Sequence, residues 1–180
     1  LESFERYQTG QAQTWEHLAL LRARSIAGQE GLGQATLERV RARVLRGHAP
    51  PWSGLAELRK RVHAERSRDS VASAAIKTGP GGLMDVDFLA EGGILERGAD
   101  RFPALPGIPA LLRAALRGSR SPELERDYAW LRRVESRARW PAAPGVGAVE
   151  LSSAAGDAAA DLVEPGLGAG GLAEGIAAAR

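Results

Sequence analysis

The sequence has no cysteine, and this absence excludes disulfide bonds, thiolate zinc sites and cysteine nucleophiles. Lysine is almost missing too, because Lys60 and Lys77 are the only two, so nearly all the positive charge comes from arginine. Aromatic residues make up 5% of the chain, and no apolar run approaches the ~20 residues that a membrane helix needs. We therefore predict a soluble, cytoplasmic protein without a membrane span.

A large excess of one charge is also missing. The 24 Lys and Arg residues nearly cancel the 22 Asp and Glu residues, which leaves a formal net charge of +2. The sequence pI is about 9.5, but so small a net charge gives too weak an average field to argue for nucleic-acid binding. We expect no nucleic-acid partner. The chain begins at Leu1 rather than at methionine, and we interpret it as a piece of a longer protein.

Apolar residues recur at helical spacing along most of the chain, and Gly or Pro residues separate the periodic stretches. The spacing predicts helices over residues 3–27, 34–46, 52–76, 83–97, 110–117 and 121–140. In the second of these helices four arginines are expected to face water: Arg39, Arg41, Arg43 and Arg46. Because no stretch alternates convincingly with a period of two, we predict an all-α fold, most simply an antiparallel helical bundle over residues 1–140.

The composition changes after Pro141, where alanine and glycine dominate and aromatic residues are absent. Burying alanine yields little free energy, and ordering glycine costs the most backbone entropy. We therefore expect residues 141–180 to form a weakly ordered tail. Within it, marginal helices are predicted at Ala154–Val163 and Leu172–Arg180.

The sharpest local feature is the glycine-rich stretch from Lys77 to Gly82, just before the helix predicted at 83–97. Backbone N–H groups at a helix start, with a lysine nearby, could meet a phosphate. The stretch lacks the Gly-Lys-Ser/Thr ending of a P-loop. The alternative is a plain turn between helices, in which Asp85 and Asp87 compensate the helix dipole. Both interpretations stay open at this point.

Asp85 and Asp87 also raise the question of a metal site. In a helix, side chains two residues apart diverge by about 200°, so we do not expect these carboxylates to share Mg²⁺. His17 has no second histidine four residues later, as a helical zinc pair requires. We therefore predict no metal ligand in this chain, and for each histidine an ordinary surface or core role rather than a catalytic one.

Three separate stretches resemble the glutamine synthetase adenylyltransferase family. The first runs from Leu1 to Arg24 and includes Phe4, Tyr7, Trp15-Glu16-His17 and Arg22-Ala23-Arg24. The second is Ile76-Lys77 followed by Gly81-Gly82 and Asp85-Val86-Asp87-Phe88, and the third is Tyr128 followed by Leu131-Arg132-Arg133-Val134-Glu135. Their order and separation also agree with the family, so the resemblance covers about residues 1–139.

The resemblance implies an all-helical region that follows the nucleotidyltransferase domain of a bifunctional enzyme. Enzymes of this family transfer AMP from ATP to a tyrosine of glutamine synthetase and remove it by phosphorolysis, under the control of a PII signal protein. The implied partners are the nucleotidyltransferase domain, glutamine synthetase and PII. ATP and Mg²⁺ are implied for the parent enzyme and not for this chain alone, because the family's catalytic carboxylates lie upstream of Leu1.

Phosphoryl-type transfer depends on positioning and on charge stabilisation, which an adjoining helical region can supply. Five residues are candidates for positions near the nucleotide: Arg22, Arg24, Lys77, Gly81 and Gly82. Four more are structural or ion-pair candidates: Trp15, Glu16, Asp85 and Asp87. In the competing interpretation, Arg22 and Arg24 pair with Asp85 and Asp87. The alternative function is a non-catalytic helical module that binds glutamine synthetase or PII.

Overall fold

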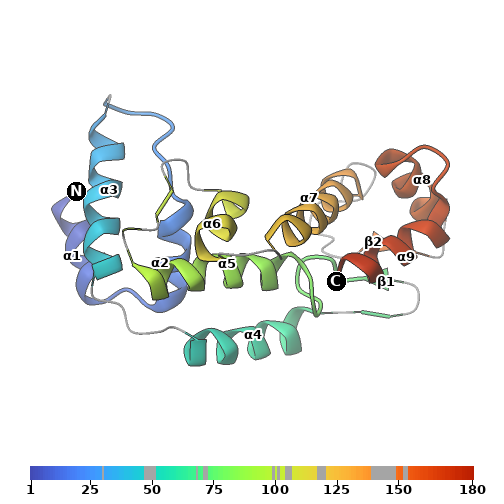
Figure 1. Cartoon of the computed structure of the whole chain (residues 1–180), viewed down its shortest axis with the longest axis horizontal. Coiled ribbons are helices and arrows are strands. Elements are labelled where there is room, and N and C mark those ends of the chain that lie inside the picture. Colours follow the sequence, from blue (N-terminus) through green and yellow to red (C-terminus); the bar gives the residue numbers. More distant parts are fainter. Residues whose placement is uncertain are drawn as a thin grey trace. The chain divides into compact units, whose positions relative to one another are not determined.

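The computed structural model describes residues 1–29, 31–46, 52–67, 69–70, 73–98, 100, 102–103, 107–116, 121–138, 149–151 and 154–180. Its helices are α1 (Glu2–Gly10), α2 (Thr14–Arg22), α3 (Leu32–Arg46), α4 (Trp52–Arg66), α5 (Leu83–Arg97), α6 (Ile108–Ala115), α7 (Ser121–Ala138), α8 (Ala154–Val163) and α9 (Gly168–Ala179) (Figure 1). The all-α prediction is confirmed. Two-residue strands, β1 (Ser73–Ala74) and β2 (Val149–Glu150), pair antiparallel, and sequence periodicity did not indicate them. Within the described ranges, no helix combines the length and apolarity needed to cross a bilayer.

The chain divides into two compact units. The first comprises Leu1–Leu58 and Asp87–Ser121, and the second comprises Arg59–Val86 and Pro122–Arg180. Helices α4 and α5 therefore contribute residues to both units. The division into a bundle over 1–140 and a tail over 141–180 stays a prediction. The expected chain break at Gly47–Pro51 and the expected helix end at Trp140 lie outside the described residues.

The single helix predicted over residues 3–27 is wrong, because the chain breaks between α1 and α2. The N–H groups of Gln11 and Ala12 both donate to the Tyr7 carbonyl, which ends α1. A new helix then starts, since the Glu16 carboxylate accepts the Gln13 N–H at 2.9 Å, as in a capping box. The Tyr7 hydroxyl donates to the same Glu16 carboxylate at 2.6 Å and so ties α1 to α2 across the break.

Helix α3 packs against both α1 and α2 in the first unit, as Figure 1 shows for α1 and α3. Val40 and Val44 are buried on its inner side, as the spacing predicted. Arg41 is also buried, with 3% of its surface exposed, so the prediction that it faces water is wrong. Its Nε donates to the Leu20 carbonyl at 3.0 Å and its Nη2 donates to the Ala23 carbonyl. Arg41 thus donates to two carbonyls at the end of α2, of which that of Leu20 also accepts the Ala23 N–H at 3.2 Å.

In the second unit, α7 buries the stripe of apolar residues predicted from its spacing, including Tyr128, Leu131 and Val134. Helices α8 and α9 pack on each other (Figure 1), and the helices predicted in the Ala/Gly-rich tail are both present. Gly175 of α9 lies under the indole of Trp130, where a Cβ would come within 2.7 Å of the ring. Small residues therefore provide close packing here. The weak order expected of the tail stays a prediction.

Helix α4 ends at Arg66, ten residues before the predicted end at Ile76. The following segment turns back on itself, because Ser70 and Ser73 exchange backbone hydrogen bonds of 2.8 and 3.2 Å. The Asp69 carboxylate accepts the Ala75 N–H at 2.7 Å and holds this turned segment in place. A side chain that binds nearby backbone offers the chain an alternative to continuing the helix.

Candidate functional site

The glycine-rich stretch forms a tight turn that leads into α5 in the second unit. Gly81 has a φ of +68°, a conformation that L side chains rarely adopt. A Cβ on Gly82 would collide with the Ile76 carbonyl and lie 2.9 Å from the Gly79 carbonyl. Both residues are therefore required by the shape of the turn itself.

Several backbone N–H groups of this turn and of the start of α5, which a phosphate could use, already have acceptors within the chain. Asp85 Oδ2 accepts the Gly81 N–H at 2.7 Å. Five further N–H groups donate to nearby carbonyls over 2.7 to 3.0 Å: those of Gly79, Gly82, Leu83, Met84 and Asp85. A phosphate could bind this backbone only by displacing these bonds. Lys77 is exposed beside the turn and remains accessible.

Asp85, on the first turn of α5, pairs with an arginine that the sequence analysis did not single out. Arg59 of α4 forms an ion pair with Asp85 and places Nη2 3.1 Å from Asp85 Oδ2. The same Nη2 donates to the Gly79 carbonyl at 2.8 Å. Arg59 thus joins the end of the turn to the start of α5. This pair replaces the one that the sequence placed between Asp85 and Arg22 or Arg24.

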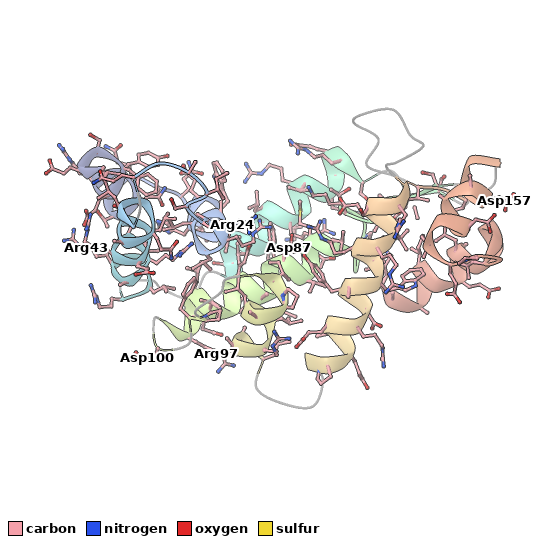
Figure 2. The ribbon with its side chains drawn as sticks, turned by 90° about the horizontal axis from the view of Figure 1, so that it is seen from above. Arg24, Arg43, Asp87, Arg97, Asp100 and Asp157 are labelled. Carbon is pink, nitrogen blue, oxygen red and sulfur yellow. The ribbon has the colours of Figure 1, made fainter. Side chains whose placement is uncertain are left out.

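Asp87 lies in the first unit and forms an ion pair with Arg22. Arg22 Nη1 lies 3.7 Å from Asp87 Oδ2, and Arg22 Nε contacts the carboxylate of Glu91 one turn further along α5. Asp85 and Asp87 therefore face different arginines, as their divergence in a helix requires. Arg24 lies exposed beyond the end of α2; Figure 2 labels it together with Asp87. Ion pairing accounts for the position of Arg22.

Glu91 is a second residue that the sequence analysis missed. Its side chain is 1% exposed, and among the residues that the structure describes neither carboxylate oxygen has a hydrogen-bond partner beyond the Arg22 ion pair. Burial raises the pKa of Glu91 to about 8; Arg22 lowers it and the nearby Asp87 raises it further. Two signals were available in the sequence: Glu91 is one helical turn after Asp87, and its nearest neighbours are Ala90, Gly92 and Gly93.

The α1–α2 segment carries three exposed aromatic side chains, Phe4, Tyr7 and Trp15, which we call the aromatic set. Their exposed fractions are 38%, 40% and 51%. The Trp15 indole donates to the Gln13 side chain at 3.0 Å, and Glu16 holds Tyr7 as described above. An open hollow of about 320 Å³ lies beside Tyr7 and is also lined by Ser3, Arg6 and Gln11. Trp15 and Glu16 therefore shape an accessible surface.

The described residues contain no group of three or more His, Asp or Glu side chains that could hold a metal ion. Asp85 and Asp87 are each neutralised by an arginine instead. Together with the engaged N–H groups of the turn, these contacts do not fit Mg²⁺ or a backbone-bound phosphate. The part of the chain that the structure describes thus offers exposed side chains and ion pairs.

Comparison with known proteins finds similarity to one enzyme family. Residues 1–39 match the family model described as glutamate-ammonia ligase adenylyltransferase. Three curated relatives carry the name bifunctional glutamine synthetase adenylyltransferase/adenylyl-removing enzyme. They are those of Stenotrophomonas maltophilia K279a (39% identity over 102 residues, 55% of this chain), Xanthomonas campestris pv. campestris B100 (36% over 119 residues, 63%) and Aromatoleum aromaticum (42% over 113 residues, 59%).

The matched segments amount to only 11–13% of the length of these relatives. The matches nevertheless extend well beyond the 39 residues of the family model. They support the resemblance to this family that the sequence indicated. Over the matched residues, this chain is similar to a small part of the glutamine synthetase adenylyltransferases.

Proposed function

We propose that this chain is a helical accessory region of a bifunctional glutamine synthetase adenylyltransferase/adenylyl-removing enzyme, acting in the cytoplasm. In this role it supplies a docking surface and lacks the catalytic carboxylates, while ATP and Mg²⁺ bind elsewhere in the enzyme. The observation that carries the proposal is the exposed aromatic set, which lies within the 39 residues that match the family model.

Large aromatic side chains left in water favour a contact with another protein surface. Trp and Tyr are enriched among the residues that dominate binding energy at protein interfaces. Phe4 and Tyr7 are three residues apart on α1, and the hydrogen bond from Tyr7 to Glu16 fixes α2 beside them. The nucleotidyltransferase domain of the same enzyme is the proposed partner, with glutamine synthetase as the protein that the enzyme modifies.

A specific observation favours protein contact over nucleotide contact in this region. The glycine N–H groups of the Lys77–Gly82 turn are engaged internally, and Arg22 is held by Asp87 and Glu91. A direct nucleotide role is therefore left to the exposed side chains of Arg24 and Lys77. The same observation suits the alternative function, a module that binds glutamine synthetase or PII without touching nucleotide.

Removal of two members of the aromatic set tests the docking role. In an enzyme that carries this region, we expect Phe4→Ser combined with Trp15→Ser to lower the rate of AMP transfer to glutamine synthetase at least tenfold. The KM for ATP should stay unchanged, because the lost contact orients domains and does not bind nucleotide. Steady-state kinetics with ATP and glutamine synthetase varied separately provide the measurement.

Two controls separate the alternatives. Ile26→Ser changes an apolar side chain that is 84% exposed and lies outside the helices, so it should leave the rate within about twofold. Lys77→Ala and Arg24→Ala should raise the KM for ATP only if these side chains touch nucleotide. An unchanged AMP-transfer rate in the doubly substituted enzyme would overturn the docking role. A higher KM for glutamine synthetase at unchanged kcat would instead indicate the binding module.

A further inference from the structure

In the second unit, the side chain of Arg180 lies against the glycine turn. Its Nη2 is 2.7 Å from Asp69 Oδ2, and its Nη1 is 3.2 Å from Asp69 Oδ1. Its Nε donates to the Pro80 carbonyl at 2.6 Å. The Arg180 side chain is only 16% exposed. All three guanidinium nitrogens therefore have acceptors, and two of these bonds form the parallel fork typical of strong arginine–carboxylate pairs.

The Asp69 carboxylate is oriented by the backbone of the chain as well as by the Arg180 guanidinium. Asp69 Oδ1 accepts the Ala75 N–H, so the backbone of the turned segment orients the carboxylate. The hydrogen bond from Arg180 is the largest cause that lowers the pKa of Asp69, followed among the lowering causes by the Ala75 N–H. A carboxylate with these two donors stays ionised over a wide pH range and provides a negative charge at a fixed position.

Glycine makes room for the arginine at two positions. A Cβ on Gly79 would collide with Arg180 Nη2 and lie 2.6 Å from Asp69 Oδ2. A Cβ on Gly81 would collide with the backbone carbonyl of Arg180. The Lys77–Gly82 stretch thus has a second reason to be glycine-rich, beyond the conformation of the turn, because it leaves space for a residue 100 positions away.

We propose that Asp69, Gly79, Pro80 and Gly81 form an arginine-binding cradle whose resident ligand is Arg180, and that this contact fastens the end of α9 to the turn. The ligand class is a planar guanidinium. Lysine carries a single compact ammonium, which cannot reach both Asp69 oxygens and the Pro80 carbonyl with fixed geometry. The charge of the cradle also excludes the opposite class of ligand, since the carboxylate of Asp69 would repel a phosphate.

The test removes the Arg180 side chain and then adds a free guanidinium compound. In the Arg180→Ala chain, the backbone amide resonances of Gly79 and Gly81 are followed during titration with N-acetyl-arginine amide. We expect saturable shifts with a dissociation constant on the order of millimolar, and at least tenfold weaker binding of N-acetyl-lysine amide. The unsubstituted chain should not respond in the same range, because Arg180 occupies the cradle. Adding Asp69→Asn to Arg180→Ala should abolish the response.

Two results would overturn the proposal: no saturable response in Arg180→Ala, or equal responses to the arginine and lysine compounds. A second variant keeps the test decisive if Arg180→Ala loses its fold. In Arg180→Lys, which retains the charge, hydrogen exchange of the α9 amides at Leu172–Ala179 should accelerate at least tenfold, with α3 amides unaffected. Exchange as slow as in the unsubstituted chain would show that charge alone holds α9 and would contradict a guanidinium cradle.

Discussion

Glu91→Gln should abolish a decrease in the free energy of unfolding that the unsubstituted chain shows as the pH rises. Glu91 has a folded-state pKa of about 8, against an ordinary value of 4.5, so the folded chain keeps a proton that the unfolded chain releases between these values. The contribution of the Glu91 carboxyl group to folding stability is fully present below pH 4.5 and is lost as the pH rises through 8. Each pH unit in that window weakens folding by up to about 1.4 kcal/mol.

Glutamine has the shape of a protonated glutamate and does not ionise. Between pH 5 and pH 8, the free energy of unfolding of the unsubstituted chain should therefore decrease more than that of Glu91→Gln. We expect the two decreases to differ by roughly 2–4 kcal/mol. Urea unfolding at several pH values measures this difference. Glu38→Gln, an exposed change on α3 of the same unit, is the matched control and should leave the pH profile as it is. Identical profiles for the unsubstituted chain and Glu91→Gln would refute the buried-carboxyl account.

Arg41→Met should destabilise the first unit by about 2–4 kcal/mol. Methionine keeps most of the apolar stem but removes the donors to the Leu20 and Ala23 carbonyls. It also removes the cation that lies 5.0 Å from the centroid of the Phe102 ring. The Ala23 carbonyl would lose its Arg41 donor, and the Leu20 carbonyl would keep the Ala23 N–H at 3.2 Å. The loss should appear as a lower urea midpoint at an unchanged slope.

Arg43→Met provides the control, because it makes the same chemical change two residues along the same helix. Arg43, labelled in Figure 2, pairs with Glu5 at 2.7 Å, but its side chain is 54% exposed. Exposed ion pairs contribute about 0–1 kcal/mol, so this variant should stay within 1 kcal/mol of the unsubstituted chain. Equal losses in both variants would show that charge at this helix, and not capping of α2 by Arg41, is what matters.

Local signals predicted helices where glycine and proline mark their ends. The bounds of α5, at Leu83 and Arg97, and of α8, at Ala154 and Val163, are those expected from the sequence. Gly81 and Gly82 precede α5, and Gly98 follows it with a φ of +83°. Such turns are properties of a few adjacent residues and are therefore visible in the sequence.

The missed features depend on residues that are distant in the sequence. Nothing near Arg41 shows that its guanidinium meets the Leu20 carbonyl, 21 positions earlier, instead of water. Asp85 pairs with Arg59 across 26 residues, and Asp69 with Arg180 across 111. Many arginines could have met these carboxylates, and packing makes the choice. The break after Gly10 was missed for a similar reason, because Glu16 supports it by binding both Tyr7 and Gln13.

The accessory role in glutamine synthetase adenylylation is tested most directly by a chimaeric enzyme. In the Stenotrophomonas maltophilia enzyme, the matching segment of 102 residues is replaced by that of this chain, and AMP transfer to glutamine synthetase is measured. We expect the chimaera to retain activity within about tenfold of its parent and to lose it when Phe4→Ser and Trp15→Ser are added. A chimaera as inactive as the enzyme that lacks the segment, although folded by circular dichroism, would contradict the accessory role.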